Sequence, residues 1–240
     1  LQKPWVSHLM RINKSFIVKR NLSGPKQQLA ASKQLSNFVR NAIENNDGSL
    51  WIAQREGRAK DGNDRTEAAV LKMLTLSRDK KSESVDDVLK KLNIVPLSIS
   101  YELDPCDCLK ARELAVGDEY HKRQFEDLES IAAGITGNKG RVHLEFGTPL
   151  MGDSLAVTDA IACIDTQIVE NYRLFQTNIW AYEALGGDDD LPATTDIPEA
   201  SISREQFMAR FDGLTPLERN LALSGYAKPV LNLLHLLAKS

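Results

Sequence analysis

The stretch "IVPLSISY", residues 94–101, decides how this sequence is expected to fold. Its apolar and β-branched residues predict a strand, and apolar and polar residues alternate in its second half. Before it, Ser84 and Asp87 have the spacing of a capping box that starts a short helix. After it, residues 118–133 predict a helix and residues 141–146 ("RVHLEF") predict a further strand.

The same alternation of strand and helix extends toward the N-terminus. Residues 15–19 ("SFIVK") and 49–53 each have the composition of a short strand, and Thr66 is expected to begin a helix. Between the two strands, apolar residues recur at helical spacing: Leu29, Leu35, Phe38, Val39, Ala42 and Ile43. Strands separated by helices favour an α/β fold, so we expect a mixed, largely parallel sheet flanked by helices.

The last third of the sequence is expected to be helical. Apolar residues three and four positions apart predict one long amphipathic helix over residues 161–182. After an acidic loop, Ser203 and Thr215 have the pattern of N-cap residues of two closing helices. We therefore expect an N-terminally incomplete α/β core at 1–150 and a helical C-terminal region at 151–240. This region is either scaffold or a docking surface for a membrane or a partner.

The composition argues against several classes of protein. The 240 residues carry a formal net charge of −3, so a general nucleic-acid binder is not expected. No uninterrupted apolar run approaches the roughly 20 residues that cross a bilayer. Cys106 and Cys108 form a close pair but lack the further ligands of a four-ligand zinc site. We expect reduced thiols, no bound metal and no cofactor.

Cations are nevertheless concentrated in "WIAQREGRAKDGNDRT", residues 51–66, where an apolar run leads into charges and glycines. Glycine lets a backbone approach a ligand closely, and guanidinium groups bind phosphate oxygens bidentately. The segment therefore predicts an anion site, most simply one for phosphate. Arg55 and Lys60 fit either a site or a solvated surface, and Arg65 is alternatively expected to cap the helix at Thr66 or to pair with Asp64.

Three blocks of the sequence occur in a characteristic order: "SFIVKR" (15–20), "WIAQREGRAKDG" (51–62) and "NIVPLSISYE" (93–102). They resemble three of the four signature blocks of the glycerolphosphate acyltransferase family. A later "VHLEFGTPL" (142–150) resembles the strand that follows these blocks in the same enzymes. The resemblance covers residues 5 to about 150, and its specificity lies in the order and spacing of the blocks.

The resemblance implies which residues bind the acceptor's phosphate: Arg20, Arg55, Glu56, Gly57, Arg58 and Lys60. Pro96 is expected to shape the strand edge near the acyl site. The block at Glu56 to Arg58 lacks the residue that usually separates glycine from arginine. Either Arg58 is the family's arginine, or Glu56 is matched and the arginine is shifted. Glu56 in turn either contacts substrate or orders the arginines through a salt bridge.

The first block of the family, His-x4-Asp, has no counterpart in this sequence. None of the histidines is followed five residues later by aspartate: His8, His121, His143 and His235. The resemblance places this block ahead of Leu1, where its histidine would act as the general base.

The function implied is acyl transfer in phospholipid biosynthesis. The donor would be acyl-ACP or acyl-CoA, and the acceptor glycerol-3-phosphate or 1-acylglycerol-3-phosphate (lysophosphatidate). The enzyme is expected at the cytoplasmic face of the cell membrane, bound peripherally or inserted shallowly. Two alternatives stay open: a non-catalytic phospholipid- or phosphate-binding relative, and an unrelated phosphate-binding domain. No Gly-x4-Gly-Lys-Ser/Thr loop supports the latter.

Overall fold

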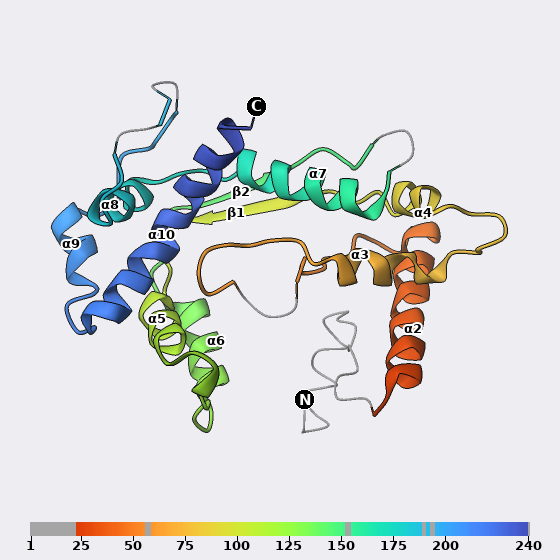
Figure 1. Cartoon of the computed structure of the whole chain (residues 1–240), viewed down its shortest axis with the longest axis horizontal. Coiled ribbons are helices and arrows are strands. Elements are labelled where there is room, and N and C mark those ends of the chain that lie inside the picture. The colour runs from red at the N-terminus through yellow and green to blue at the C-terminus, as the bar shows by residue number, and fades with distance from the viewer. Residues whose placement is uncertain (1–22, 56–58, 152–154, 189–190, 193–194, 240) are drawn as a thin grey trace. The chain divides into compact units, whose positions relative to one another are not determined.

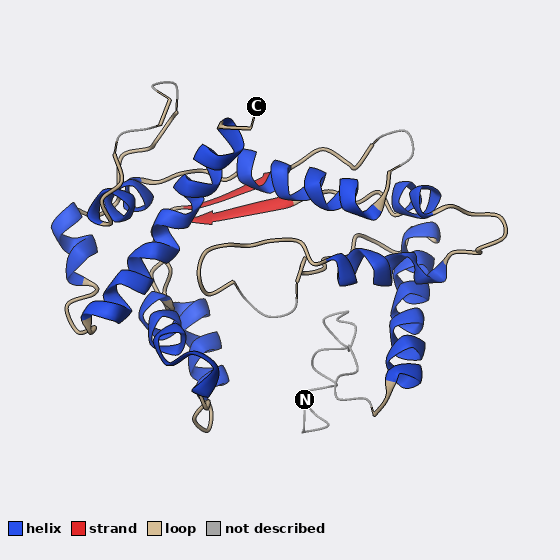
Figure 2. Ribbon diagram, viewed as in Figure 1, coloured by secondary structure: helices blue, strands red, loops and turns tan. Residues whose placement is uncertain are grey.

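The computed structural model describes residues 23–55, 59–151, 155–188, 191–192 and 195–239. It confirms a mixed α and β fold, in which the described residues form helices and one two-stranded sheet (Figure 2). The chain forms two compact units. Unit 1 comprises Leu1–Gln54, Glu67–Ile94 and Leu150–Ile161, and unit 2 comprises Arg55–Thr66, Val95–Pro149 and Ala162–Ser240. The expected division at residue 150 stays a prediction.

Unit 1 contains α2 (Pro25–Glu44), α3 (Ala68–Leu74), the 3-10 turn η1 (Thr75–Ser77) and α4 (Val85–Lys91) (Figure 1). α2 and α4 are helices that the sequence predicted. The capping box of α4 is confirmed, because Asp87 N donates to Ser84 Oγ at 3.0 Å and Ser84 N donates to Asp87 Oδ2 at 2.8 Å. α2 packs against α3 and η1.

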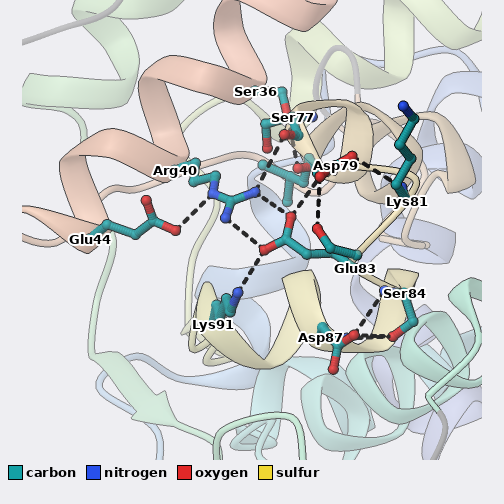
Figure 3. A network of polar contacts seen from close by, with 12 residues as sticks. Ser36, Arg40, Glu44, Ser77, Asp79, Lys81, Glu83, Ser84, Asp87 and Lys91 are labelled. Carbon is teal, nitrogen blue, oxygen red and sulfur yellow. Dashed lines mark hydrogen bonds and ion pairs between the residues drawn. The ribbon is translucent and has the colours of Figure 1, made fainter.

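An ionic network joins α2 to the segment before α4 (Figure 3). Arg40 donates to both carboxylate oxygens of Glu83, each at 2.7 Å, and Glu83 also accepts from Lys91 at 2.6 Å. These bonds, those from Arg40 above all, hold the pKa of Glu83 far below its usual range. Because these cations are matched by carboxylates, the network stabilises the packing of unit 1 and is not an open anion site.

The predicted strand at 49–53 is not formed. These residues have no regular secondary structure, and Trp51 is 70 % exposed. A strand needs a neighbour to satisfy its backbone groups, and no described segment pairs with this one. Instead, Gln54 O accepts a hydrogen bond from Glu67 N at 2.9 Å. The predicted strand at 15–19 lies outside the described residues.

The sheet of unit 2 pairs β1 (Leu97–Tyr101) with β2 (Val142–Phe146). The strands at 94–101 and 141–146 are thus confirmed with shorter bounds. Their pairing is antiparallel, with Ile99 opposite Leu144. The described residues show no parallel pairing, so the expected largely parallel sheet is not shown.

The polar face of this sheet is buried and its apolar face is exposed, the reverse of the usual arrangement. Ser98 and Ser100 are buried, and the polar face bonds to α7 (Val157–Glu170) and the chain after it. Ser98 Oγ donates to Ile168 O at 3.0 Å, and Arg173 N donates to Ser100 Oγ at 2.9 Å. The apolar face carries the cross-strand pairs of Leu97, Ile99 and Tyr101 with Phe146, Leu144 and Val142. On this face, Phe146 is 66 % exposed.

The helices of unit 2 partly follow the prediction. They are α5 (Asp107–Val116), η2 (Gly117–Glu119), α6 (Glu126–Thr136), α7 (Val157–Glu170, which begins in unit 1), α8 (Gln176–Ala184), α9 (Arg204–Ala209) and α10 (Pro216–Leu237). The capping boxes that start α9 and α10 are confirmed. The helix expected at 118–133 begins later, and the single helix expected over 161–182 is wrong. It breaks because Ser100 captures Arg173 N, and Phe175 N then donates to Asn178 Oδ1 at 2.8 Å as α8 starts.

The core of unit 2 lies where α10 packs against α5 and α8. Phe207 and Phe211 are fully buried and pack edge to face, as Phe207 does with Tyr226. Within this apolar surrounding, Asp107 accepts from Arg210 at 2.6 Å and from the Tyr226 hydroxyl at 2.9 Å. These bonds tie the start of α5 to α9 and α10.

A second buried carboxylate, Glu102, follows β1. It accepts from Ser201 N at 2.6 Å and from Arg141 N at 2.8 Å. Burial alone would raise the pKa of Glu102, but the two backbone N–H groups hold it below its usual value. Glu102 therefore fixes the turn before β2 while remaining ionised.

Candidate phosphate site

The segment 55–66 is held at its C-terminal end by Asp165 of α7. Asp165 Oδ1 accepts from Thr66 N at 2.9 Å and from Thr66 Oγ1 at 2.7 Å. Arg65 lies 3.8 Å from the other oxygen of Asp165 and also donates to Asn63 and Asn232. Neither expectation for Arg65 is met: α3 begins at Ala68, and the arginine pairs with Asp165 instead of Asp64. Arg65 therefore anchors the segment.

Gly62 brings the backbone of the segment against α10. Its φ is +72°, and a Cβ built on it would lie 2.3 Å from the carbonyl oxygen of Gly225. From the other side the contact is looser, because a Cβ on Gly225 would lie 3.8 Å from Lys60 O. The close approach that glycine permits at position 62 is thus to a helix.

This asymmetry predicts opposite effects of two glycine substitutions. Gly62→Ala should lower the free energy of unfolding by about 2–4 kcal/mol, because it adds a clash to a left-handed backbone conformation. Gly225→Ala should leave stability unchanged or raise it by up to about 1 kcal/mol, since alanine favours a helix interior. Urea unfolding of both variants measures the difference, and equal destabilisation would contradict this packing.

Lys60 is directed to α5, where its ammonium forms a short ion pair with Glu113. A cavity of about 30 Å³ adjoins this pair, between α5 and α6. Its lining carries two further lysines, each paired with a carboxylate: Lys110 with Asp104 at 2.6 Å and Lys122 with Asp127 at 2.7 Å. The cavity has room for a water molecule but not for a phosphate ester.

Arg55 differs from Lys60 and Arg65, the other described cations of the segment. Its side chain is half-buried, and its Nε is a buried nitrogen without a hydrogen-bond partner among the described residues. A buried donor without a partner costs free energy, so such groups mark places where a ligand or ion completes the bonding. Arg55 is the described residue that best supports an anion site.

The other expected site residues divide into two groups. Pro96 is buried immediately before β1, and its carbonyl oxygen accepts from Gly147 N at 2.8 Å, which extends the pairing of the two strands by one bond. Its role at an acyl site stays a prediction. Four of the expected residues lie outside the described part of the chain: Arg20, Glu56, Gly57 and Arg58.

The Cys108 thiol is not activated as a nucleophile. Burial, followed by the nearby Asp107 carboxylate, raises the pKa of the Cys108 thiol to about 11, so it stays protonated at neutral pH. Cys106 is the residue immediately before α5. Among the described residues, no cluster of three or more His, Cys, Asp or Glu side chains is arranged to hold a metal ion.

The sequence did not reveal the residues that hold the segment in place. Asp165 was detectable in principle, because it is an acid beside the apolar row of α7. Nothing in the sequence pointed to Glu113 or Gly225. Glu113 pairs with Lys60, which is 53 residues away in the sequence, and Gly225 is contacted by the backbone at Gly62.

No family model, curated protein or solved structure matches the chain. Within the described residues, no helix has both the length and the apolar character needed to cross a membrane.

Proposed function

We propose that this chain belongs to an acyltransferase that moves a fatty acyl group from acyl-ACP or acyl-CoA to a glycerol phosphate acceptor. The observation that carries the proposal is Arg55, whose buried Nε has no partner among the described residues. It opens a segment whose far end is anchored by Asp165. Such a segment suits a dianionic phosphate, because its backbone is held while one guanidinium nitrogen has no partner among the described residues.

In this proposal the protein contributes mainly positioning. Arg55 and Arg58, with Arg20 from the neighbouring block, hold the phosphate so that the free hydroxyl of the acceptor faces the thioester. The histidine of a His-x4-Asp block removes the hydroxyl proton, and the oxygen attacks the thioester carbonyl and expels the thiol. Lys60 contributes its charge without binding the phosphate directly, because its ammonium is already paired with Glu113.

The proposal extends to the fold. A two-stranded sheet is marginal by itself, and in the described part of the chain no third strand pairs with this one, whose apolar face is outward. We propose that further strands join β1 and β2 in a largely parallel sheet. We place the enzyme at the cytoplasmic membrane surface, where an acyl chain on acceptor and product would reside.

The experiment compares acceptors that differ only in the phosphate. With the full-length protein and an acyl thioester, thiol release should depend on glycerol-3-phosphate or lysophosphatidate. Glycerol and monoacylglycerol should give background rates. Equal rates with the phosphate-free acceptors would contradict a phosphate site, and binding of lysophosphatidate without turnover would favour the non-catalytic relative.

A further inference from the structure

A groove of about 490 Å³ lies between α8 and the chain that leads into α9 (Figure 1). Its lining combines apolar side chains, among them Trp180, Ile197 and Ile202, with the polar side chains of Gln176, Glu199 and Ser203. A concave site of this volume, with an aromatic ring and a few polar groups, is typical of small-molecule binding. The proposed acyl transfer assigns no role to this groove.

Long-range bonds hold the two walls of the groove in place. The buried Glu102 joins them: its backbone carbonyl oxygen accepts from Thr177 Oγ1 of α8 at 2.7 Å, and its carboxylate accepts from Ser201 N at 2.6 Å. Arg204, the first residue of α9, pairs with Glu183 of α8 at 2.7 Å. The groove is therefore formed without a ligand, which lowers the entropic cost of binding one.

Trp180 gives the groove an aromatic wall. The indole packs against Phe207 of the core, with the ring centroids 6.0 Å apart, and the side chain is half-buried. This contact fixes the ring while part of it still lines the groove. The face of an indole attracts cations, and the attraction grows when the cation is partly desolvated.

The charge around the groove is negative. Of the described residues that line it, Glu199 alone is charged, and within the described part of the chain its carboxylate has no ion-pair partner. The one cation at 183–205, Arg204, is paired with Glu183, and Asp196 is paired with Arg173. The same stretch contains seven acids: Glu183, Asp188, Asp189, Asp190, Asp196, Glu199 and Glu205. This excess repels an anionic ligand and attracts a cationic one.

We propose that the groove binds a small organic cation, whose ammonium group pairs with Glu199 and whose apolar body packs on Trp180, Ile197 and Ile202. A fatty acyl chain fits less well, because it would cover the Glu199 carboxylate without pairing it. A metal ion fits less well too, since one carboxylate is far from a full set of oxygen ligands. The inference is independent of the proposed function, because no described residue of the segment 55–66 lines the groove.

Three probes with the same phenyl body test the proposal: 2-phenylethylamine, 2-phenylethanol and phenylacetate, which carry a cationic, a neutral and an anionic head at neutral pH. Each is titrated into the 240-residue chain while NMR follows the indole N–H signals of its three tryptophans. Trp180→Phe identifies the signal of Trp180, which should shift. The amine should bind about 3- to 10-fold more tightly than the alcohol, and the carboxylate most weakly.

Glu199→Gln removes the charge and keeps the shape of the side chain. The affinity for the amine should fall about 3- to 10-fold, to that for the alcohol, while the affinity for the alcohol stays unchanged. The matched control is Asp188→Asn, which removes an exposed acid of the same stretch that does not line the groove. Its affinity for the amine should stay within about twofold of the original, because solvent and salt screen a charge outside the groove.

Four results would overturn the proposal. The first is that no probe shifts the Trp180 signal. The second is that the alcohol or the carboxylate binds as tightly as the amine. The third is that Glu199→Gln keeps the preference for the amine, and the fourth is that Asp188→Asn loses it as fully as Glu199→Gln does. Thermal unfolding of both variants should match the original chain, since both replaced side chains are exposed.

Discussion

Residues 1–240 alone should transfer no acyl group above background, even with acyl-ACP, acyl-CoA and either glycerol phosphate acceptor at saturation. The proposed reaction needs a base to remove the proton of the acceptor's hydroxyl, and no histidine of this sequence has the His-x4-Asp spacing. A positioned general base contributes typically about 10²–10⁴-fold to the rate. The measurement is thiol release from each donor.

The control for this prediction is a protein in which a His-x4-Asp block precedes Leu1. Turnover should appear there, and replacing the histidine of that block by alanine should abolish it. Clear turnover by the 240-residue chain would show that another residue acts as the base. The strongest described alternative is His143 on β2, whose Nε2 lies 3.4 Å from Glu145.

Local signals in the sequence predicted the elements that local interactions determine. The capping box of Ser84 and Asp87 is formed, and so are those that begin at Ser203 and Thr215, because each uses residues three positions apart. The strands around residues 97–101 and 142–146 were also predictable from their composition.

Long-range contacts decide what the sequence did not predict. The apolar spacing continues past Arg173, but Ser100 binds the backbone of Arg173 and ends the helical run between α7 and α8. Alternation in β1 predicts two different faces without showing which is buried. The polar face is inside because Ile168 O and Arg173 N satisfy its hydroxyls.

The sequence shows the cluster of charges that makes up the candidate site, but not how its cations are paired. The cluster of charges at 55–66 is visible in the sequence, and one of its arginines, Arg55, has a donor without a described partner. Which cations are already neutralised depends on other parts of the chain. Lys60 pairs with Glu113 and Arg65 with Asp165, and neither pairing follows from spacing within the segment.

The acceptor KM of Arg58→Ala tests the central claim, that this segment binds the acceptor's phosphate. In the full-length enzyme this KM should rise by about 10- to 100-fold, because each charge-assisted bond to phosphate contributes roughly 1.5–3 kcal/mol. The donor KM should change little, since the thioester binds elsewhere. Arg58→Lys should restore only part of the affinity, because it keeps the charge but loses the fork.

Lys122→Ala is the control, since it removes a cation that lies outside this segment and is paired with Asp127. Steady-state kinetics, with each substrate varied in turn, should leave its acceptor KM within about threefold of the original. If Arg55→Ala abolishes acceptor binding while Arg58→Ala does not, then Arg55, and not Arg58, corresponds to the arginine of the family's third block. An acceptor KM that neither Arg55→Ala nor Arg58→Ala raises would contradict the phosphate site.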